Sequence, residues 1–244
     1  MTKAIQLFGL YKAFNGQQIL RGVDLDIMTG EIITILGGSG TGKSVLLRHI
    51  VGLAKPDAGQ ILIEGEDIVP LRESELLEVR KKVAILFQGA ALFDSLSVKE
   101  NVAFSLREHT RMTEAEIRDR VSEVLDLVGM AGTEEKVPAE LSGGMRKRVG
   151  LARAIALTPR AVLYDEPTTG LDPRNVDKIN ELIADLRAKI GVTSVVVTHD
   201  LQSAFRISDR VALLYEGRIA TTQTPEEIGK SEDPVVQEFL AGHH

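Results

Sequence analysis

The chain has 244 residues, and 43% of them are hydrophobic, which is enough for a real core in one large domain or two small ones. Its 29 Lys and Arg against 35 Asp and Glu give a net charge of −6, and this argues against a dedicated nucleic-acid-binding protein, because such proteins usually carry a basic surplus. The absence of cysteine excludes disulfides, thiolate metal sites and thiol catalysis, and it agrees with a cytosolic compartment.

The first part of the chain shows patterns typical of strands. Residues 4–7 and 23–27 alternate between apolar and polar side chains on either side of the turn signal Asn15-Gly16, which predicts antiparallel strands. Residues 32–36 form an apolar run that predicts a buried strand. A turn over residues 55–59 and an alternating segment over residues 60–65 then predict a further hairpin.

A glycine-rich segment follows the apolar run and opens into a helical pattern. It reads Gly37-Gly38-Ser39-Gly40-Thr41-Gly42-Lys43-Ser44, with the G-x-x-x-x-G-K-S spacing of a phosphate-binding loop. Glycines let the backbone fold around phosphates, whose negative charge meets backbone N–H groups and a helix N-terminus. In such a loop Lys43 reaches the β- and γ-phosphates of a nucleotide and Ser44 supplies a ligand to Mg²⁺. The sequence therefore predicts a nucleoside triphosphate site here.

Apolar runs at residues 83–87, 161–164 and 194–197 predict parallel strands that end at polar residues, which indicates an α/β fold. Between residues 98 and 156 this β pattern stops. A capping box at Thr113 and Glu116 begins a helix that we expect to end at Gly129. A second helix is expected after Ser142 and runs through Arg153; we interpret the basic cluster at residues 146–148 on it as a solvated helix face.

Two adjacent carboxylates, Asp165 and Glu166, follow the strand at 161–164. In a phosphate site the first can hold Mg²⁺ and the second can polarise the attacking water. Such a pair is common on protein surfaces, but together with a phosphate-binding loop it predicts catalysis of ATP hydrolysis.

In their order along the chain, these motifs closely resemble the nucleotide-binding subunit of an ABC transporter. The resemblance rests on the phosphate-binding loop and then on Gln88, Leu141-Ser142-Gly143-Gly144, Tyr164-Asp165-Glu166, Gly170-Leu171-Asp172 and His199. It implies a P-loop NTPase with a RecA-like core, an antiparallel β-subdomain and an inserted α-helical subdomain. The expected organisation is one domain, with residues 1–97 and 157–225 as the catalytic core and β-subdomain, 98–156 as the helical signature subdomain and 226–244 as a C-terminal tail.

The same resemblance implies a sandwich of two copies with two ATP molecules between them. Each ATP is contacted by the phosphate-binding loop of one copy and by Ser142, Gly143 and Gly144 of the other. A hydroxyl and free N–H groups at a helix N-terminus suit a γ-phosphate from a partner chain. Asp172 resembles the residue that communicates across the dimer.

Further site residues are implied by their matching positions. Gln88 resembles the switch residue that senses Mg²⁺ and water, and His199 resembles the histidine that contacts the γ-phosphate, so both join Glu166 as expected catalytic residues. The family stacks adenine on an aromatic side chain before the second strand; Phe14 fits best, and Tyr11 is the alternative.

Two features resemble the MlaF-type ATPases of Mce-family phospholipid transporters. Met145 stands where most ABC ATPases have Gln, so any hydrogen bond from that amide is lost, and the same Met occurs in the MlaF-type group. The segment over residues 88–110 also resembles that group. The resemblance implies phospholipid transport at the cytoplasmic face of the inner membrane, with integral-membrane permease subunits, a STAS-domain subunit and an Mce-domain protein as partners. The alternatives are the ATPase of another importer, for example one for polar amino acids, and a soluble ABC protein outside transport.

The stretch from Gly89 to Asn101 is expected to help receive a helix of the permease. Its apolar residues are unusually dense for a loop; we expect Leu92 and Phe93 to anchor the partner helix and Leu96 to lie in the core. No apolar run approaches the ~20 residues of a membrane span, and no N-terminal segment has the pattern of a signal peptide, so we expect a soluble chain that is not secreted. His243-His244 are assigned no function.

Overall fold

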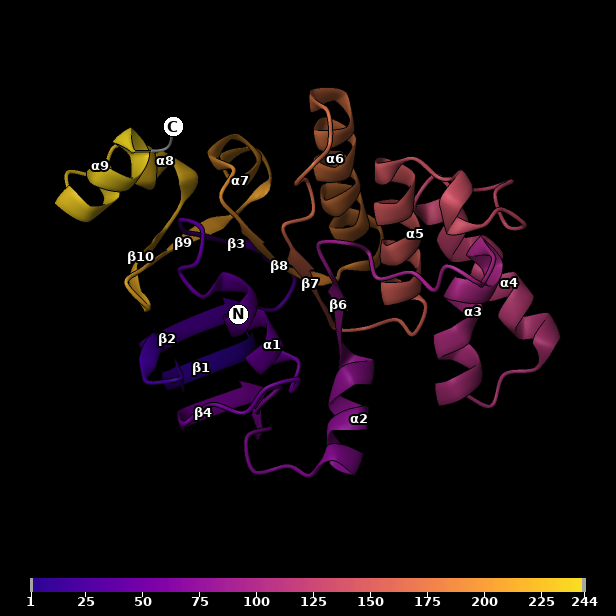
Figure 1. Ribbon diagram of the computed structural model, residues 1–244, viewed down its shortest axis with the longest axis horizontal. Helices are drawn as coiled ribbons and strands as arrows, with labels where there is room; N and C mark the ends of the chain where they lie inside the picture. The colour runs from indigo at the N-terminus through magenta and orange to yellow at the C-terminus, as the bar shows by residue number, and fades with distance from the viewer. Residues whose placement is uncertain (1, 243–244) are drawn as a thin grey trace.

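A six-stranded sheet forms the centre of the molecule in the computed structural model, which describes residues 2–242 (Figure 1). Its strand order is β10-β9-β3-β8-β7-β6, and all neighbours are parallel except the pair β9 and β10. Strands β3, β7 and β8 are buried along their whole length, as expected of parallel strands covered on both faces. The strands are β3 (Ile32–Leu36), β6 (Val83–Leu86), β7 (Ala161–Asp165), β8 (Thr193–Thr198), β9 (Arg210–Tyr215) and β10 (Arg218–Gln223).

A second, antiparallel sheet has the order β2-β1-β4-β5, which confirms the strands expected in the first part of the chain. Its strands are β1 (Lys3–Phe14), β2 (Gln17–Met28), β4 (Ala58–Ile63) and β5 (Glu66–Asp67). Asn15 and Gly16 join the first two strands with φ angles of 50° and 80°, the left-handed conformation that a two-residue hairpin requires. Register shifts within β1 interrupt the simple alternation of its two faces.

Helices cover the sheets and extend to both ends of the molecule. The helices α3, α4 and α5 lie together at one end and α8 and α9 at the opposite end, as Figure 1 shows. The helical group α3 to α5 lies between β6 and β7 in the chain, as the sequence predicts. The helices are α1 (Lys43–Ile50), α2 (Glu73–Lys82), α3 (Val98–His109), α4 (Glu114–Leu127), α5 (Gly143–Ile155), α6 (Pro173–Ile190), α7 (Leu201–Ile207), α8 (Pro225–Gly229) and α9 (Pro234–Ala241), with a 3₁₀ turn at Pro138–Glu140.

The expected helix starts are confirmed by their caps. Thr113 and Glu116 form the reciprocal capping box of α4, since each side chain accepts a hydrogen bond from the backbone N–H of the other. Ser142 caps α5 by accepting a hydrogen bond from the N–H of Met145 at 3.3 Å. The side chain of Met145 itself packs against the core of the helical end.

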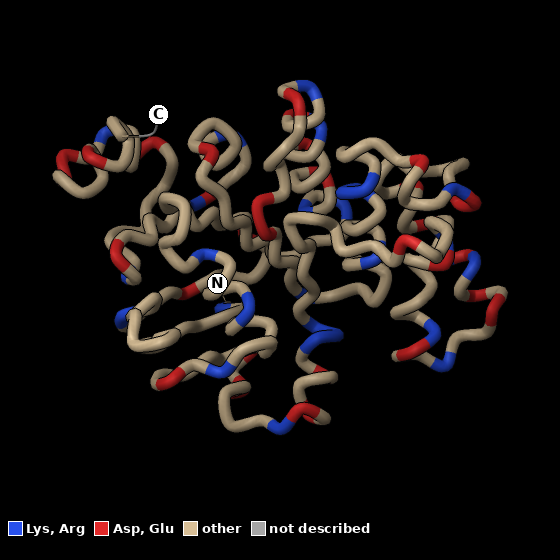
Figure 2. Tube along the Cα trace, in the orientation of Figure 1, with Lys and Arg blue, Asp and Glu red and all other residues tan. Residues whose placement is uncertain are grey.

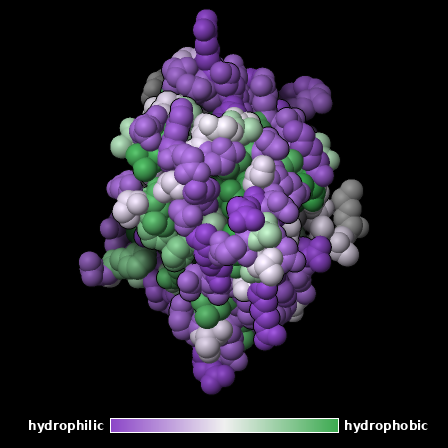
Figure 3. All heavy atoms as spheres, turned by 90° about the vertical axis from the view of Figure 1, so that its right-hand side faces the viewer, coloured by the Kyte–Doolittle hydropathy of each residue, from purple (hydrophilic) through white to green (hydrophobic). Residues whose placement is uncertain are grey.

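The buried side chains of the part of the chain that the structure describes form three clusters, one under the helical group, one between the two sheets and a smaller one beneath α7 to α9. Acidic and basic residues are interspersed throughout the molecule, and neither sign is gathered in one region, as Figure 2 shows. The face at the helical end is largely hydrophilic, with hydrophobic residues scattered among charged ones (Figure 3). Within residues 2–242, no helix combines the length and the apolar character that crossing a bilayer would require. His243-His244 lie outside the described residues.

The loop between β6 and α3 departs in part from expectation. Leu92 is partly buried and packs against the core cluster of the helical end, so its expected role as an anchor for a partner stays a prediction. Leu96, expected in the core, is only partly buried. Phe93 is 44% exposed and remains available for contact.

Candidate nucleotide site

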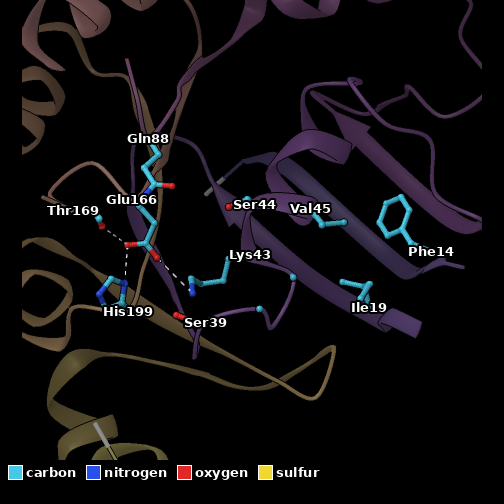
Figure 4. A pocket seen from close by; sticks show the side chains of 12 residues that line it. Phe14, Ile19, Ser39, Lys43, Ser44, Val45, Gln88, Glu166, Thr169 and His199 are labelled. Atoms are coloured by element: carbon cyan, nitrogen blue, oxygen red, sulfur yellow. Dashed lines mark hydrogen bonds and ion pairs between the residues drawn. The ribbon is translucent and has the colours of Figure 1, made fainter. Parts of the chain in front are cut away.

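The carboxyl ends of four neighbouring parallel strands meet at one edge of the central sheet. There β3 leads into the phosphate-binding loop, β6 leads to Gln88, β7 ends at Asp165 before Glu166, and β8 leads to His199. These segments surround a pocket of about 480 Å³ (Figure 4). Its lining residues are Phe14, Ile19, Ser39, Gly40, Gly42, Lys43, Ser44, Val45, Gln88, Glu166, Thr169 and His199.

The glycines of the phosphate-binding loop are required by the local backbone. Gly42 has φ of 103°, and a Cβ added there would lie 2.8 Å from Cγ2 of Ile19. A Cβ on Gly37 would lie 2.7 Å from the carbonyl oxygen of Leu214. The loop therefore adopts a path that larger residues could not follow, and α1 begins directly after it at Lys43.

The ammonium of Lys43 lies inside this loop. Its Nζ donates to the carbonyl oxygens of Gly37 at 2.7 Å and Gly38 at 3.0 Å, and lies 3.5 Å from Oε1 of Glu166. Burial lowers the pKa of Lys43, while the nearby Glu166 carboxylate opposes that shift. The side chain is thus held as a buried cation facing the pocket.

Ser44 and Asp165 approach each other at the base of the site. Ser44 Oγ donates to Oδ1 of Asp165 at 2.7 Å, although the two residues are far apart in the chain. Gln88, which follows β6, lines the same pocket, so its amide oxygen could also bind a metal ion there. Hydroxyl, carboxylate and amide oxygens are the hard donors that Mg²⁺ prefers, and the residues present therefore fit this ion.

Glu166 lies at one end of the pocket, where donors surround its carboxylate (Figure 4). Its Oε2 lies 3.0 Å from Nδ1 of His199 and accepts hydrogen bonds from the hydroxyls of Thr169 at 3.1 Å and Thr198 at 3.3 Å. Its backbone has φ of 48°, unusual for a residue with a side chain and still more so before a proline. Sequence patterns did not indicate the two threonines, since only tertiary packing brings them to this carboxylate.

The basic cluster on α5 is not the solvated face that its sequence suggested. Lys147 is only 6% exposed, and its Nζ donates to the backbone carbonyl oxygen of Glu166 at 3.2 Å. Burial lowers the pKa of Lys147, opposed by the carboxylates of Asp165 and Glu166. Arg148 is partly buried and donates to the carbonyl of Val128 at 2.9 Å, so only Arg146 lies at the exposed surface.

Phe14 lies at the end of the pocket opposite Glu166, near Ile19 and Val45 (Figure 4). Its ring is 47% exposed, and the ammonium of Lys12 lies 5.4 Å from the ring centre. Tyr11 does not line the pocket, and its hydroxyl instead lies close to Gly22. Of the two aromatic candidates, only Phe14 therefore lines the pocket.

The remaining predicted residues gather outside this pocket. Ser142, Gly143 and Gly144 lie at the N-terminus of α5, beside the turn that contains Asp172. A Cβ on Gly144 would lie 3.3 Å from the side chain of Asn175. Asp172 caps α6 by accepting from the N–H of Asn175 at 3.2 Å and from its Nδ2 at 2.6 Å, and these bonds lower the pKa of Asp172. Within one copy, these residues therefore do not meet the pocket around Lys43.

Comparisons with known proteins agree with this geometry. The family model described as ABC transporter matches residues 20–169. The chain is 46% identical over 242 residues to a "Probable ribonucleotide transport ATP-binding protein mkl" of Mycobacterium leprae, covering 99% of this chain and 70% of that protein. It is 42% identical over 220 residues to the "Intermembrane phospholipid transport system ATP-binding protein MlaF" of Haemophilus influenzae, covering 90% of this chain and 83% of that protein.

A solved structure has the same fold. The ATP-binding cassette MJ0796, described as a dimer in a post-hydrolysis state bound to ADP and Pi, matches with a TM-score of 0.83 and 34% identity. The match covers 91% of this chain and 98% of the cassette. The P-loop NTPase fold with its antiparallel β-subdomain and inserted helices is therefore that of an ABC cassette. The chain belongs to the ABC transporter family and is one of its ATPases.

Proposed function

We propose that this ATPase binds ATP with Mg²⁺ in the pocket around Lys43 and uses its hydrolysis to drive a membrane permease that moves phospholipid. The observation that carries the nucleotide assignment is that Lys43 and Ser44, which follow β3, line one pocket with Glu166, which follows β7, while Ser44 also donates to Asp165. Lys43 binds the β- and γ-phosphates, the glycine-rich backbone surrounds them, and Phe14 stacks on adenine. Bound Mg²⁺ would neutralise phosphate charge, held by Ser44, Asp165 and Gln88.

Glu166 acts on the attacking water. Its carboxylate is 12% exposed and held by three donors, so it points in a fixed direction towards the phosphate-binding loop. A positioned carboxylate can accept the proton of a water as that water attacks phosphorus. His199 is 53% exposed and extends from the same carboxylate, from where it contacts the γ-phosphate.

The second half of each nucleotide site is supplied by another copy of the chain. Ser142, Gly143 and Gly144 lie at a helix N-terminus outside the pocket of their own copy, a position that suits the γ-phosphate of a partner's ATP. Asp172 follows Leu171, whose side chain lies beside Gly143, and would communicate across this interface. The dimeric form of the related cassette supports this arrangement.

A second pocket, of about 410 Å³, is the proposed docking groove for a helix of the permease. Its exposed aromatic pair is Phe93 on the loop after β6 and Phe104 on α3, whose ring centres lie 4.9 Å apart. Arg153 of α5 lies 5.8 Å from the ring of Phe93 and lines the same groove. Because the loop that carries Phe93 follows Gln88 in the chain, a partner helix anchored on this loop would sense movement of Gln88.

The proposed cargo is phospholipid, at the cytoplasmic face of the inner membrane, and the further partners are a STAS-domain subunit and an Mce-domain protein. Met145, which follows Leu141-Ser142-Gly143-Gly144, and the relative named MlaF support this assignment. Ribonucleotide is the second candidate, because it appears in the name of the relative from Mycobacterium leprae. Purification of the full chain from the membranes of its host should recover a permease, and phospholipid should stimulate the ATPase rate of that complex. Stimulation by ribonucleotide and not by phospholipid would reverse the choice of cargo.

The catalytic role of Glu166 is tested by Glu166→Gln. The amide cannot accept the proton, so turnover should fall by at least about a hundredfold while ATP binding is kept. Hydrolysis in single turnover and ATP affinity by equilibrium titration would be measured together. A variant that hydrolyses ATP near the wild-type rate would remove this assignment.

The shared site is tested by the dependence of rate on protein concentration. Because an isolated copy lacks the partner's Ser142 and Gly144, the ATPase rate should rise faster than linearly with protein concentration when no permease is present. Sedimentation would establish the range in which the chain is monomeric. A strictly linear rate in that range would contradict the shared site.

A further inference from the structure

Helix α5 makes an unexpected contact with the catalytic loop. Lys147 lies five positions after Ser142 at the N-cap, or about 7.5 Å further along the helix. The ammonium of Lys147 is buried and donates to the backbone carbonyl oxygen of Glu166 at 3.2 Å. One short segment of helix therefore joins the residue that faces a partner's nucleotide to the backbone of the catalytic residue in its own site.

The backbone that Lys147 holds is in an uncommon conformation. Glu166 combines a φ of 48° with a following proline, and both features are disfavoured for a residue with a side chain. Its N–H donates to the carbonyl of Val197 at 2.9 Å, which secures the peptide on one side. The carbonyl oxygen of Glu166 accepts from Lys147 and from the N–H of Thr169 at 3.3 Å, and the charged donor makes the hydrogen bond from Lys147 stronger than a neutral one would be.

The surroundings of Lys147 act on its charge in opposite directions, because burial lowers its pKa while two nearby carboxylates oppose that shift. Asp165 and Glu166 both attract the ammonium, and this attraction opposes the cost of burial. Helix α5 itself packs against α3, α4 and β6, so its position is set by the whole helical group. A shift of that group would thus carry the carbonyl of Glu166 with it.

We propose that Lys147 is a positioning residue that orients Glu166 and links its alignment to the binding of the partner's nucleotide at Ser142. This inference rests on the proposed function, in which Glu166 acts on water and Ser142 contacts the ATP of the other copy. Lys147 is not among the residues that line the nucleotide pocket. It acts through the backbone of Glu166, so it affects the chemical step rather than nucleotide binding.

The test uses three variants of the full chain. Lys147→Met removes charge and donor, Lys147→Gln keeps a shorter neutral donor, and Lys178→Met is the control at an exposed lysine of α6. We expect kcat to fall about ten- to a hundredfold in the Met variant and less in the Gln variant, because small misplacements of a catalytic group are costly. ATP affinity and Tm should stay close to the wild-type values, and the control should be unchanged.

A double variant tests the link to the partner's site. If Lys147 and Ser142 act in one chain of contacts, Lys147→Met combined with Ser142→Ala should lower kcat by less than the product of the two single effects. A loss equal to that product would overturn the link. Equal kcat for wild type and both Lys147 variants, or a fall in kcat matched by a loss of ATP affinity and Tm, would overturn the positioning role.

The outcomes separate this inference from the proposed function. Full activity in Glu166→Gln or Ser142→Ala would defeat the proposed function itself, whatever the Lys147 variants do. Loss of activity in those two variants with normal kcat at Lys147 would defeat only the inference. If the Met variant does not fold, the Gln variant decides: lowered kcat at unchanged ATP affinity supports the role, and unchanged kcat refutes it.

Discussion

Asn101 is expected to hold the loop that carries Phe93, and its replacement should measurably destabilise the protein. It is fully buried on α3, and its side chain binds the backbone of that loop. Oδ1 accepts from the N–H of Phe93 at 2.8 Å, while Nδ2 donates to the carbonyls of Phe93 at 3.1 Å, Leu96 at 3.0 Å and Ser97 at 3.1 Å. One side chain therefore satisfies several groups of a segment that has no regular structure.

The magnitude follows from which groups lose their partner in Asn101→Ala. The carbonyls of Phe93 and Ser97 also accept backbone hydrogen bonds, at 3.1 Å and 2.9 Å, so they remain paired. The N–H of Phe93 and the carbonyl of Leu96 instead lose the hydrogen bond that Asn101 provides. Each buried group left unpaired costs about 1–3 kcal/mol. Because the loop borders solvent, we expect a loss of about 2–4 kcal/mol in the free energy of unfolding, or a fall in Tm of about 5–15 °C.

Urea unfolding of the full chain would measure this loss, with Glu108→Ala as the control at an exposed position of the same helix. The urea midpoint should decrease in Asn101→Ala while the slope of the transition is kept, as expected for a change in stability alone. The control should unfold like the wild type. A midpoint for Asn101→Ala equal to that of the control would refute the reasoning, because the hydrogen bonds would then contribute nothing to stability.

Three further predictions concern binding, docking and pH. Lys43→Ala should weaken ATP binding itself, because the buried point charge next to the phosphates is lost, and unchanged affinity in an equilibrium titration would count against this role. Phe93→Glu should abolish co-purification with the permease while Tm is kept. Phe8→Glu is the control at a similarly exposed aromatic on β1 and should have no effect. If the Phe93 variant still co-purifies with the permease, Phe93 does not belong to the docking groove. Burial lowers the pKa of His49, so the unfolded chain binds a proton that the folded chain does not, and stability should decline as the pH falls below about 6.5. His49→Gln should flatten this decline in Tm between about pH 7 and pH 5, and an identical pH dependence in both proteins would show that another group is responsible.

Local sequence patterns determined much of the fold and most of the nucleotide pocket. The phosphate-binding loop could be located because its function demands glycines followed by Lys43 and Ser44, and few other structures need that spacing. Asp165, Glu166 and His199 could be placed because apolar runs identify buried strands, whose carboxyl ends meet at one sheet edge. Helix caps such as Thr113 with Glu116 could be predicted because their hydrogen bonds join residues only three positions apart.

Only the tertiary structure decided which side chains are buried between the elements. Lys147 has the sequence context of an exposed lysine, yet it is buried because α5 packs on several sides, and the carboxylates of Asp165 and Glu166 offset part of the cost of enclosing a charge. Leu92 turned out to pack against the core while its neighbour Phe93 is exposed, a difference that depends on the path of the loop. A short-range sequence pattern indicates whether a segment is a helix or a strand and where it ends. Which other element packs against each of its faces depends on contacts between residues far apart in the chain. That physical difference is why the sequence located the catalytic groups, whereas the residues that hold them in place emerged only from the packed structure.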